Sequence, residues 1–393
     1  MITNVLDDID LRHLGEQLQQ ARHKCGITQE SAAKVINAAR TTMVAIEKGE
    51  RRLKATELIK LARTYGISVS NFVRPRPVIE PFKVRFQRVD RPNEVQQSQI
   101  ESVIQEWEKF CQNYLELEEI MNAPLPQNYP CEYEVSGMPI ERTAEAIAVG
   151  ERQRLGLGDG PIPLLRDTLE EAVGLRIFYL KMPSKYSEVY TYDEKLGGCM
   201  AINANHPEER RRWSLAHGYL HFLAHRRKSV VDLIEGQYKR MPESEQLAEA
   251  FSKYFLMPTS GLLKRFNDIC RANKNQKFTP TNLFILARYY GVSVEAITNR
   301  LEEMELLPSG TWERLHGHGL KVRKVQEEVD LEAIPQRTDL TPIYYQYLAI
   351  EALDLGLITE GRFADFLNVD RLEARHIANI LRRHNKTFES NLV

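Results

Sequence analysis

At 393 residues the chain is longer than one ordinary domain, and we expect two or three domains. Its 42% hydrophobic and 27% charged residues are typical of soluble globular proteins. Its formal net charge of −1 gives no overall electrostatic attraction to nucleic acids or membranes. Five cysteines without a C-x-x-C pair argue against a disulfide framework or a cysteine zinc site. Without a signal peptide or a long apolar run, we expect a cytoplasmic protein with no membrane contact.

Residues 1–75 predict a small helical module. Apolar residues recur at helical spacing from Leu11, Gly26 ends that helix, and Thr28 caps the next one. A short turn then leads to a third helix that ends at Gly49, and a fourth follows. The segment carries twelve Lys and Arg against eight Asp and Glu, a net charge of +4 that is compatible with DNA binding.

The stretch TQESAAKVINAARTTMVAIEKGERR has the pattern of a helix-turn-helix, with small residues Ala32 and Ala33 where two short helices cross. It resembles the Xre/Cro family of phage-repressor-like regulators. The resemblance implies that the helix from Arg40 enters the major groove of double-stranded operator DNA. It implies base or phosphate contacts from Gln29, Arg40, Thr41, Thr42, Lys48, Arg51 and Arg52.

Such modules act on paired half-sites, so we expect a homodimer whose interface comes from elsewhere in the chain. The alternative is a four-helix protein-interaction module whose basic face is simply solvated.

Residues 76–140 predict a linker and a connecting helix. The stretch VRPRPVIEP holds three prolines in nine residues and cannot be helical. Alternation at residues 83–86 suggests a short strand. Apolar residues at three-four spacing over 98–119 predict a long helix, which is either a core helix of the next domain or a dimerising helix.

Residues 141–307 predict an α+β domain. Helices are expected at 143–155 and 164–172, followed by strands at 175–180 and 199–205. A long helix then spans 208–225 and contains the sequence HGYLH.

His217 and His221 lie four residues apart in that helix, so both are on one face and can bind one metal ion. A zinc peptidase with H-E-x-x-H uses the Glu to activate a metal-bound water. This chain has Gly218 at that position. Loss of a general base typically lowers the rate by about 10²–10⁴-fold, and no replacement base is evident from the sequence.

A third ligand is expected on the later helix ESEQLAEAF. Glu245 is the first candidate, with Glu243 and Glu249 as alternatives. The competing interpretation is that the two histidines simply pack in a polar core.

The segments ERRRWSLAHGYLHFLAHR and EQLAEAFSKYFLMP are similar to those of the ImmA/IrrE zinc metallopeptidases. GLGDGPIPLL upstream and LARYYGVSVEAITNRL downstream belong to the same pattern. The resemblance implies that zinc is held by His217, His221 and Glu245. It also implies that no catalytic residue remains, because Gly218 stands at the position of the general base.

Residues 308–393 predict a helical extension that resembles the C-terminal part of long ImmA/IrrE proteins and could support dimerisation or a second nucleic-acid contact. The expected fold class is therefore mainly α with a small α+β domain: an N-terminal helix-turn-helix, a central zincin-like domain and a helical C-terminal extension.

The sequence predicts a DNA-binding transcriptional regulator whose metallopeptidase-like domain lacks the catalytic Glu and acts as a sensor or scaffold for a protein partner or small-molecule effector. One alternative is an active zinc endopeptidase that cleaves a repressor or itself, with a base from outside the motif. Another is an antitoxin-like or phage-defence-associated regulator that binds a second protein.

Overall fold

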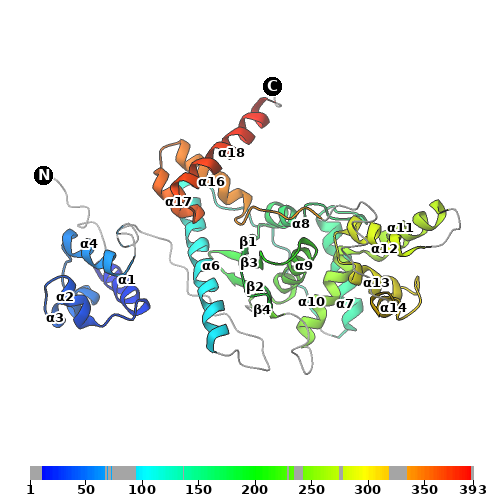
Figure 1. The fold of residues 1–393 in the computed structure, drawn as a ribbon, viewed down its shortest axis with the longest axis horizontal. Helices are drawn as coiled ribbons and strands as arrows, with labels where there is room; N and C mark the ends of the chain where they lie inside the picture. The colour runs from blue at the N-terminus through cyan, green and yellow to red at the C-terminus, as the bar shows by residue number, and fades with distance from the viewer. Residues whose placement is uncertain are drawn as a thin grey trace. The chain divides into compact units, whose positions relative to one another are not determined.

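The computed structural model divides the chain into two compact units, residues 1–77 and 78–393. Helices dominate both, and one small sheet lies in the second (Figure 1), which confirms the expected fold class. None of the helices in the described part is long and apolar enough to cross a membrane. The structure describes residues 11–66, 69, 72, 94–135, 137–227, 230–233, 242–273, 278–317 and 334–390.

The first unit is a helix-turn-helix with two supporting helices. Thr28 caps the second helix as expected, since its side-chain oxygen accepts a hydrogen bond from the Ser31 N–H at 3.2 Å. Asn37 makes the turn with φ of 54°, in the left-handed region that Asn tolerates better than most residues. The helices are α1 (Leu11–Lys24), α2 (Gln29–Val35), α3 (Arg40–Glu47) and α4 (Ala55–Thr64).

Helix α1 packs closely against the end of α3. A Cβ atom at Gly15 would lie 2.6 Å from the carbonyl oxygens of Ile46 and Glu47, so only glycine permits this approach. A buried ion pair closes the same contact, with Arg22 Nε 2.6 Å from Glu47 Oε1. The Gln29 amide also donates to Glu47 at 2.9 Å, which ties α2 to the pair.

The sheet of the second unit has the strand order β1-β3-β2-β4. β1 is parallel to β3, whereas β2 is antiparallel to both β3 and β4. The sequence predicted β1 and β3 but missed β2 and β4. In β2, YSEVYTYD contains one aliphatic residue among polar and tyrosine residues, although most of the strand is buried. The strands are β1 (Arg176–Leu180), β2 (Tyr186–Asp193), β3 (Gly197–Asn203) and β4 (Val230–Leu233).

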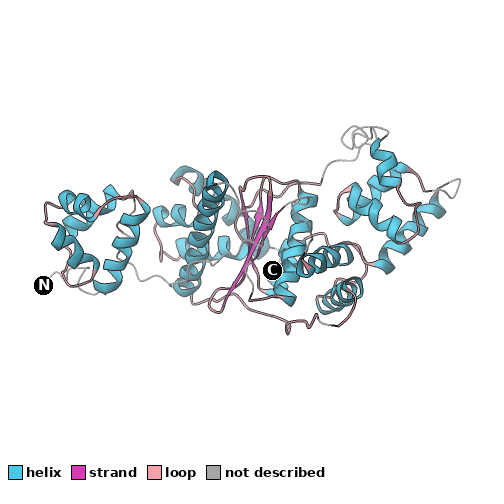
Figure 2. Ribbon diagram, turned by 90° about the horizontal axis from the view of Figure 1, so that it is seen from below, coloured by secondary structure: helices cyan, strands magenta, loops and turns pink. Residues whose placement is uncertain are grey.

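Helices cover both faces of this sheet (Figure 2). In β1, Ile177 and Tyr179 join the core on one face, while Phe178 and Leu180 join the core on the other. A strand buried on both faces is expected to be apolar throughout, as β1 is.

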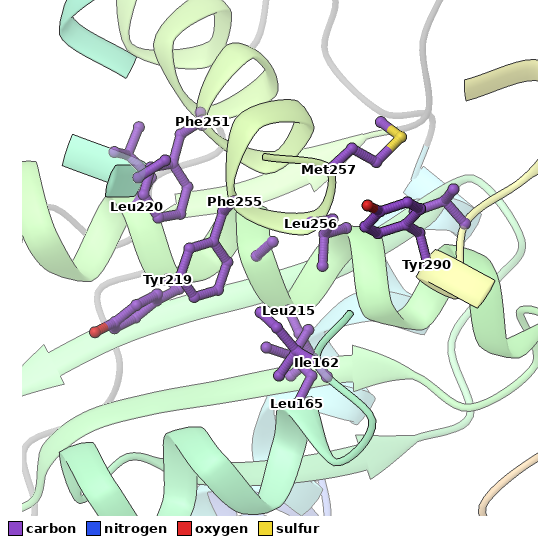
Figure 3. Packing of buried hydrophobic residues seen from close by; sticks show 14 of the residues in the cluster. Ile162, Leu165, Leu215, Tyr219, Leu220, Phe251, Phe255, Leu256, Met257 and Tyr290 are labelled. Carbon is purple, nitrogen blue, oxygen red and sulfur yellow. The ribbon is translucent and has the colours of Figure 1, made fainter. Parts of the chain in front are cut away.

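The first face carries the helices that surround the HGYLH segment. Helix α10 packs against both α7 and α9, and the rings of Tyr219, Phe251 and Phe255 fill the space between α9 and α10 (Figure 3). The elements on this side are α7 (Ile140–Arg154), α8 (Leu165–Thr168), the π-helical turn η1 (Leu169–Val173), α9 (Glu208–Ala224), α10 (Glu243–Leu256), α11 (Thr259–Ala272), α12 (Pro280–Tyr290), α13 (Val294–Glu303) and α14 (Thr311–Gly317).

The other face carries the connecting helix together with the C-terminal helices. Trp107 and Tyr114 are buried there, as expected for a core helix. Buried ion pairs join Glu118 to Arg176 of β1 at 2.6 Å and Glu116 to Arg362. The expected strand at residues 83–86 lies outside the described residues. The helices are α6 (Glu94–Met121), α16 (Ile343–Asp354), α17 (Glu360–Leu367) and α18 (Arg371–Ser390).

We predict that Glu47→Ala unfolds the first unit locally, because it leaves the Arg22 guanidinium buried without its carboxylate. Breaking one side of a buried pair costs about 3–5 kcal/mol. Hydrogen–deuterium exchange of peptides from residues 11–66 of the full chain should therefore show lost protection. The exposed Glu50→Ala is the matched control, and equal protection in the two variants would contradict the prediction.

Candidate functional site

Helix α9 runs through the interior of the second unit and is buried along most of its length. The structure brings two of its side chains, His217 and His221, against α10, where they are 4% and 0% exposed. Their ring centroids lie 5.0 Å apart, as the four-residue spacing predicts.

Glu245, in the first turn of α10, completes a buried cluster with these histidines. His217 Nε2 lies 3.5 Å from Glu245 Oε2, and His221 Nε2 lies 3.5 Å from Glu245 Oε1. Ligand atoms on a tetrahedral zinc with bonds of about 2.0–2.1 Å stand roughly 3.3 Å apart. The ligand atoms that the three residues offer, one each, all lie within 4.8 Å of one another, so an inward movement of these side chains would let them hold one zinc ion.

The electrostatics of the cluster favour an ionised Glu245. Burial acts to raise the pKa of this carboxyl group, but the hydrogen bond and charge of His221, followed by the charges of His217 and His225, outweigh it and lower the pKa. A carboxylate among imidazoles is the donor set that a divalent transition metal prefers.

The other two carboxylates considered as third ligand lie elsewhere. Glu243 is exposed at the start of α10. Glu249 accepts a hydrogen bond from Trp213 Nε1 at 3.0 Å. Among the described residues, only His217, His221 and Glu245 form a group with metal-ligand spacing.

Two residues near the cluster were missed in the sequence. His225 ends α9 one turn after His221, with ring centroids 5.7 Å apart, and its signal was the repeated four-residue spacing of the histidines. Glu188 of β2 is 1% exposed and places Oε1 3.0 Å from His217 Nδ1. No local pattern marks Glu188, because it is 29 residues from His217 and lies on a strand that was not predicted.

The predicted DNA-contacting residues fall into two groups in the first unit. Arg40 and Thr41 are exposed at the start of α3, and Lys48 and Arg52 are also exposed. The rest have intermediate exposure: Thr42, Arg51, which pairs with Glu57 at 3.0 Å, and Gln29, which donates to Glu47.

Comparison with known families matches both regions. A helix-turn-helix domain matches residues 13–71, and an IrrE N-terminal-like domain matches residues 170–302. No curated protein matches the chain.

Two solved structures align over nearly the full length. The crystal structure of Bacillus thuringiensis PlcR in complex with the peptide PapR7 and DNA is 12% identical, covers 97% of this chain and 99% of that chain, and has a TM-score of 0.18. The crystal structure of ComR from Streptococcus suis is 10% identical, with coverages of 94% and 96% and a TM-score of 0.16. The two family matches show that the chain is a fusion of a helix-turn-helix domain with an IrrE N-terminal-like domain of the metallopeptidase type.

Proposed function

We propose that the protein is a DNA-binding transcriptional regulator whose IrrE-like domain holds zinc without hydrolysing peptides. The observation that carries this proposal is the buried cluster of His217, His221 and Glu245 beside a glycine at position 218. This cluster supports the proposal because the three side chains that would bind the metal lie together, while glycine at 218 has no side chain that could activate water.

The donor set supports zinc as the metal. Two imidazole nitrogens and one carboxylate are a common three-ligand set that leaves a fourth position open. A bound zinc ion acts as a Lewis acid toward whatever occupies that position. His217 and His221 each present Nε2 toward Glu245, and Glu245 supplies the negative charge.

The geometry gives less support to an active endopeptidase. Gly218 cannot accept a proton. The nearby Glu188 lies at Nδ1 of His217, on the edge of the ring away from the Nε2 that would bind the metal, and Glu249 is held by Trp213. A general base must reach the metal-bound water itself. We therefore assign no catalytic residue and propose a sensing or scaffolding role that responds to a small-molecule effector or a protein partner.

DNA binding is proposed for the first unit, through the exposed start of α3. Arg40 would read a guanine edge in the major groove, Thr41 or Thr42 a thymine methyl, and Lys48 and Arg52 would contact phosphates. Because Gln29 and Arg51 already pair with Glu47 and Glu57, their DNA contacts would share or replace these bonds. One such module makes few phosphate contacts, so we propose a homodimer on paired half-sites.

We predict that the purified full chain contains about one zinc ion per chain, measured by elemental analysis. His217→Ala and Glu245→Gln should each reduce the zinc content sharply, because each removes one of three ligands. His376→Ala, which changes an exposed histidine on α18, is the matched control and should keep the metal. Zinc at wild-type level in His217→Ala would place the metal elsewhere.

For DNA, we predict that Arg40→Ala weakens binding to an operator selected from a random duplex pool by about 1–3 kcal/mol, or roughly 5–150-fold. Lys48→Ala should weaken binding to selected and unrelated duplexes alike. It should also lower the slope of log affinity against log salt concentration by about one, because one phosphate contact is lost. Fluorescence anisotropy at several salt concentrations measures both effects.

Lys60→Ala, an exposed basic residue on α4, serves as the control for net charge. If Arg40→Ala and Lys60→Ala bound the selected operator equally well, the assignment of α3 as the recognition helix would be wrong.

A further inference from the structure

The carboxylate of Glu188 approaches the cluster of His217, His221 and Glu245 from the sheet rather than from a helix. Its strand β2 lies between β3 and β4, and Glu188 pairs with Ile202 on one side and Asp232 on the other. Like Tyr190 two residues later, the side chain faces α9, where its Oε1 lies 3.0 Å from His217 Nδ1.

Gly218 provides the space that this carboxylate occupies. A Cβ atom at position 218 would lie 2.9 Å from Glu188 Oε1 and 3.3 Å from its Cδ, closer than ordinary van der Waals contact. The Sδ of Met200 on β3 would be 3.3 Å away as well, so a side chain at 218 would crowd two neighbours at once. A side chain at 218 would therefore force the Glu188 carboxylate to shift from the position in which it contacts His217.

The two edges of the His217 ring have different partners. Nδ1 faces Glu188, whereas Nε2 faces Glu245. A carboxylate acceptor at Nδ1 keeps the ring hydrogen there and leaves the lone pair on Nε2 for a metal. Carboxylates placed behind ligating histidines fix the ring and increase metal affinity.

We infer that Glu188 is a positioning residue for the metal ligand His217, and that glycine at 218 is required to admit it. This inference rests on the proposed zinc site and assigns a reason to its missing base. Position 218 would carry a carboxylate beside the metal in a peptidase. Here it leaves space for the Glu188 carboxylate behind the ligand His217. The site is thereby arranged to retain zinc rather than to activate water.

A double-mutant cycle on the full chain tests this coupling. The zinc affinity of wild type, Glu188→Ala, Gly218→Ala and the double variant is measured by competition with a chromophoric chelator. Glu188→Ala should weaken zinc about 10–100-fold. Gly218→Ala should weaken it too, because the new methyl group displaces the Glu188 carboxylate. The double variant should be no weaker than Glu188→Ala, since the added methyl then meets no carboxylate.

Two variants control for general damage. Glu194→Gln alters an exposed carboxylate directly after β2 and should leave zinc affinity unchanged. Gly150→Ala, within α7, places a Cβ in ordinary contact 3.4 Å from Tyr133 and should raise the melting temperature of the zinc-free protein by about 2 °C, because alanine favours helix. Gly218→Ala should give this increase only when Glu188 is also replaced.

Wild-type affinity in Glu188→Ala would overturn the positioning role while leaving the zinc site intact. An increase in melting temperature for Gly218→Ala equal to that of Gly150→Ala would overturn the steric coupling. Absence of zinc from the wild type would instead refute the proposed function and the affinity claim with it, and the melting temperatures would still decide whether residues 188 and 218 compete for space.

Discussion

The burial of α9 between the sheet and α10 is the constraint on which the second unit depends. A helix buried on nearly all sides cannot leave charged or polar groups without partners, because each would lose its hydration. Arg211 and Arg212 satisfy this by donating to backbone carbonyls of His206 and Gly291, each at 3.0 Å. The histidines satisfy it with Glu188 and Glu245. The residues that support α9 and the proposed metal ligands therefore lie on one helix.

The same constraint explains why a carboxylate is present on β2. A buried strand would ordinarily present apolar residues to the helix above it, as β1 does with Ile177. Glu188 departs from that rule because it faces a histidine across the gap that Gly218 leaves open. Gly218 in the helix and Glu188 in the strand therefore explain each other: the missing side chain at 218 leaves the space that the buried carboxylate occupies.

Much of the fold could be predicted from local patterns, since caps and helical periodicity act over a few residues. Thr28 marked the start of α2, and the HGYLH segment fell on a helix as its spacing required. The packing of α16 and α17 against α6 could not be predicted, because those contacts join residues more than two hundred positions apart, such as Glu116 and Arg362. Glu188 belongs to the same class, since neither its strand nor its partner was visible in the sequence.

A metal site that holds its ion without hydrolysis can still transmit a signal through stability. Binding to the folded state alone stabilises it by RT ln(1 + [L]/Kd), which is about 4 kcal/mol when the ligand is present at a thousand times its Kd. The cluster of His217, His221 and Glu245 lies in the core that α7, α9 and α10 form with the sheet. A ligand that fixes these three side chains would therefore stabilise the packing of those helices. A peptidase must open this region to admit a polypeptide, whereas a binding site gains affinity from every contact that keeps it closed. Under the proposed function, glycine at 218 together with a carboxylate behind His217 would favour the second of these conditions.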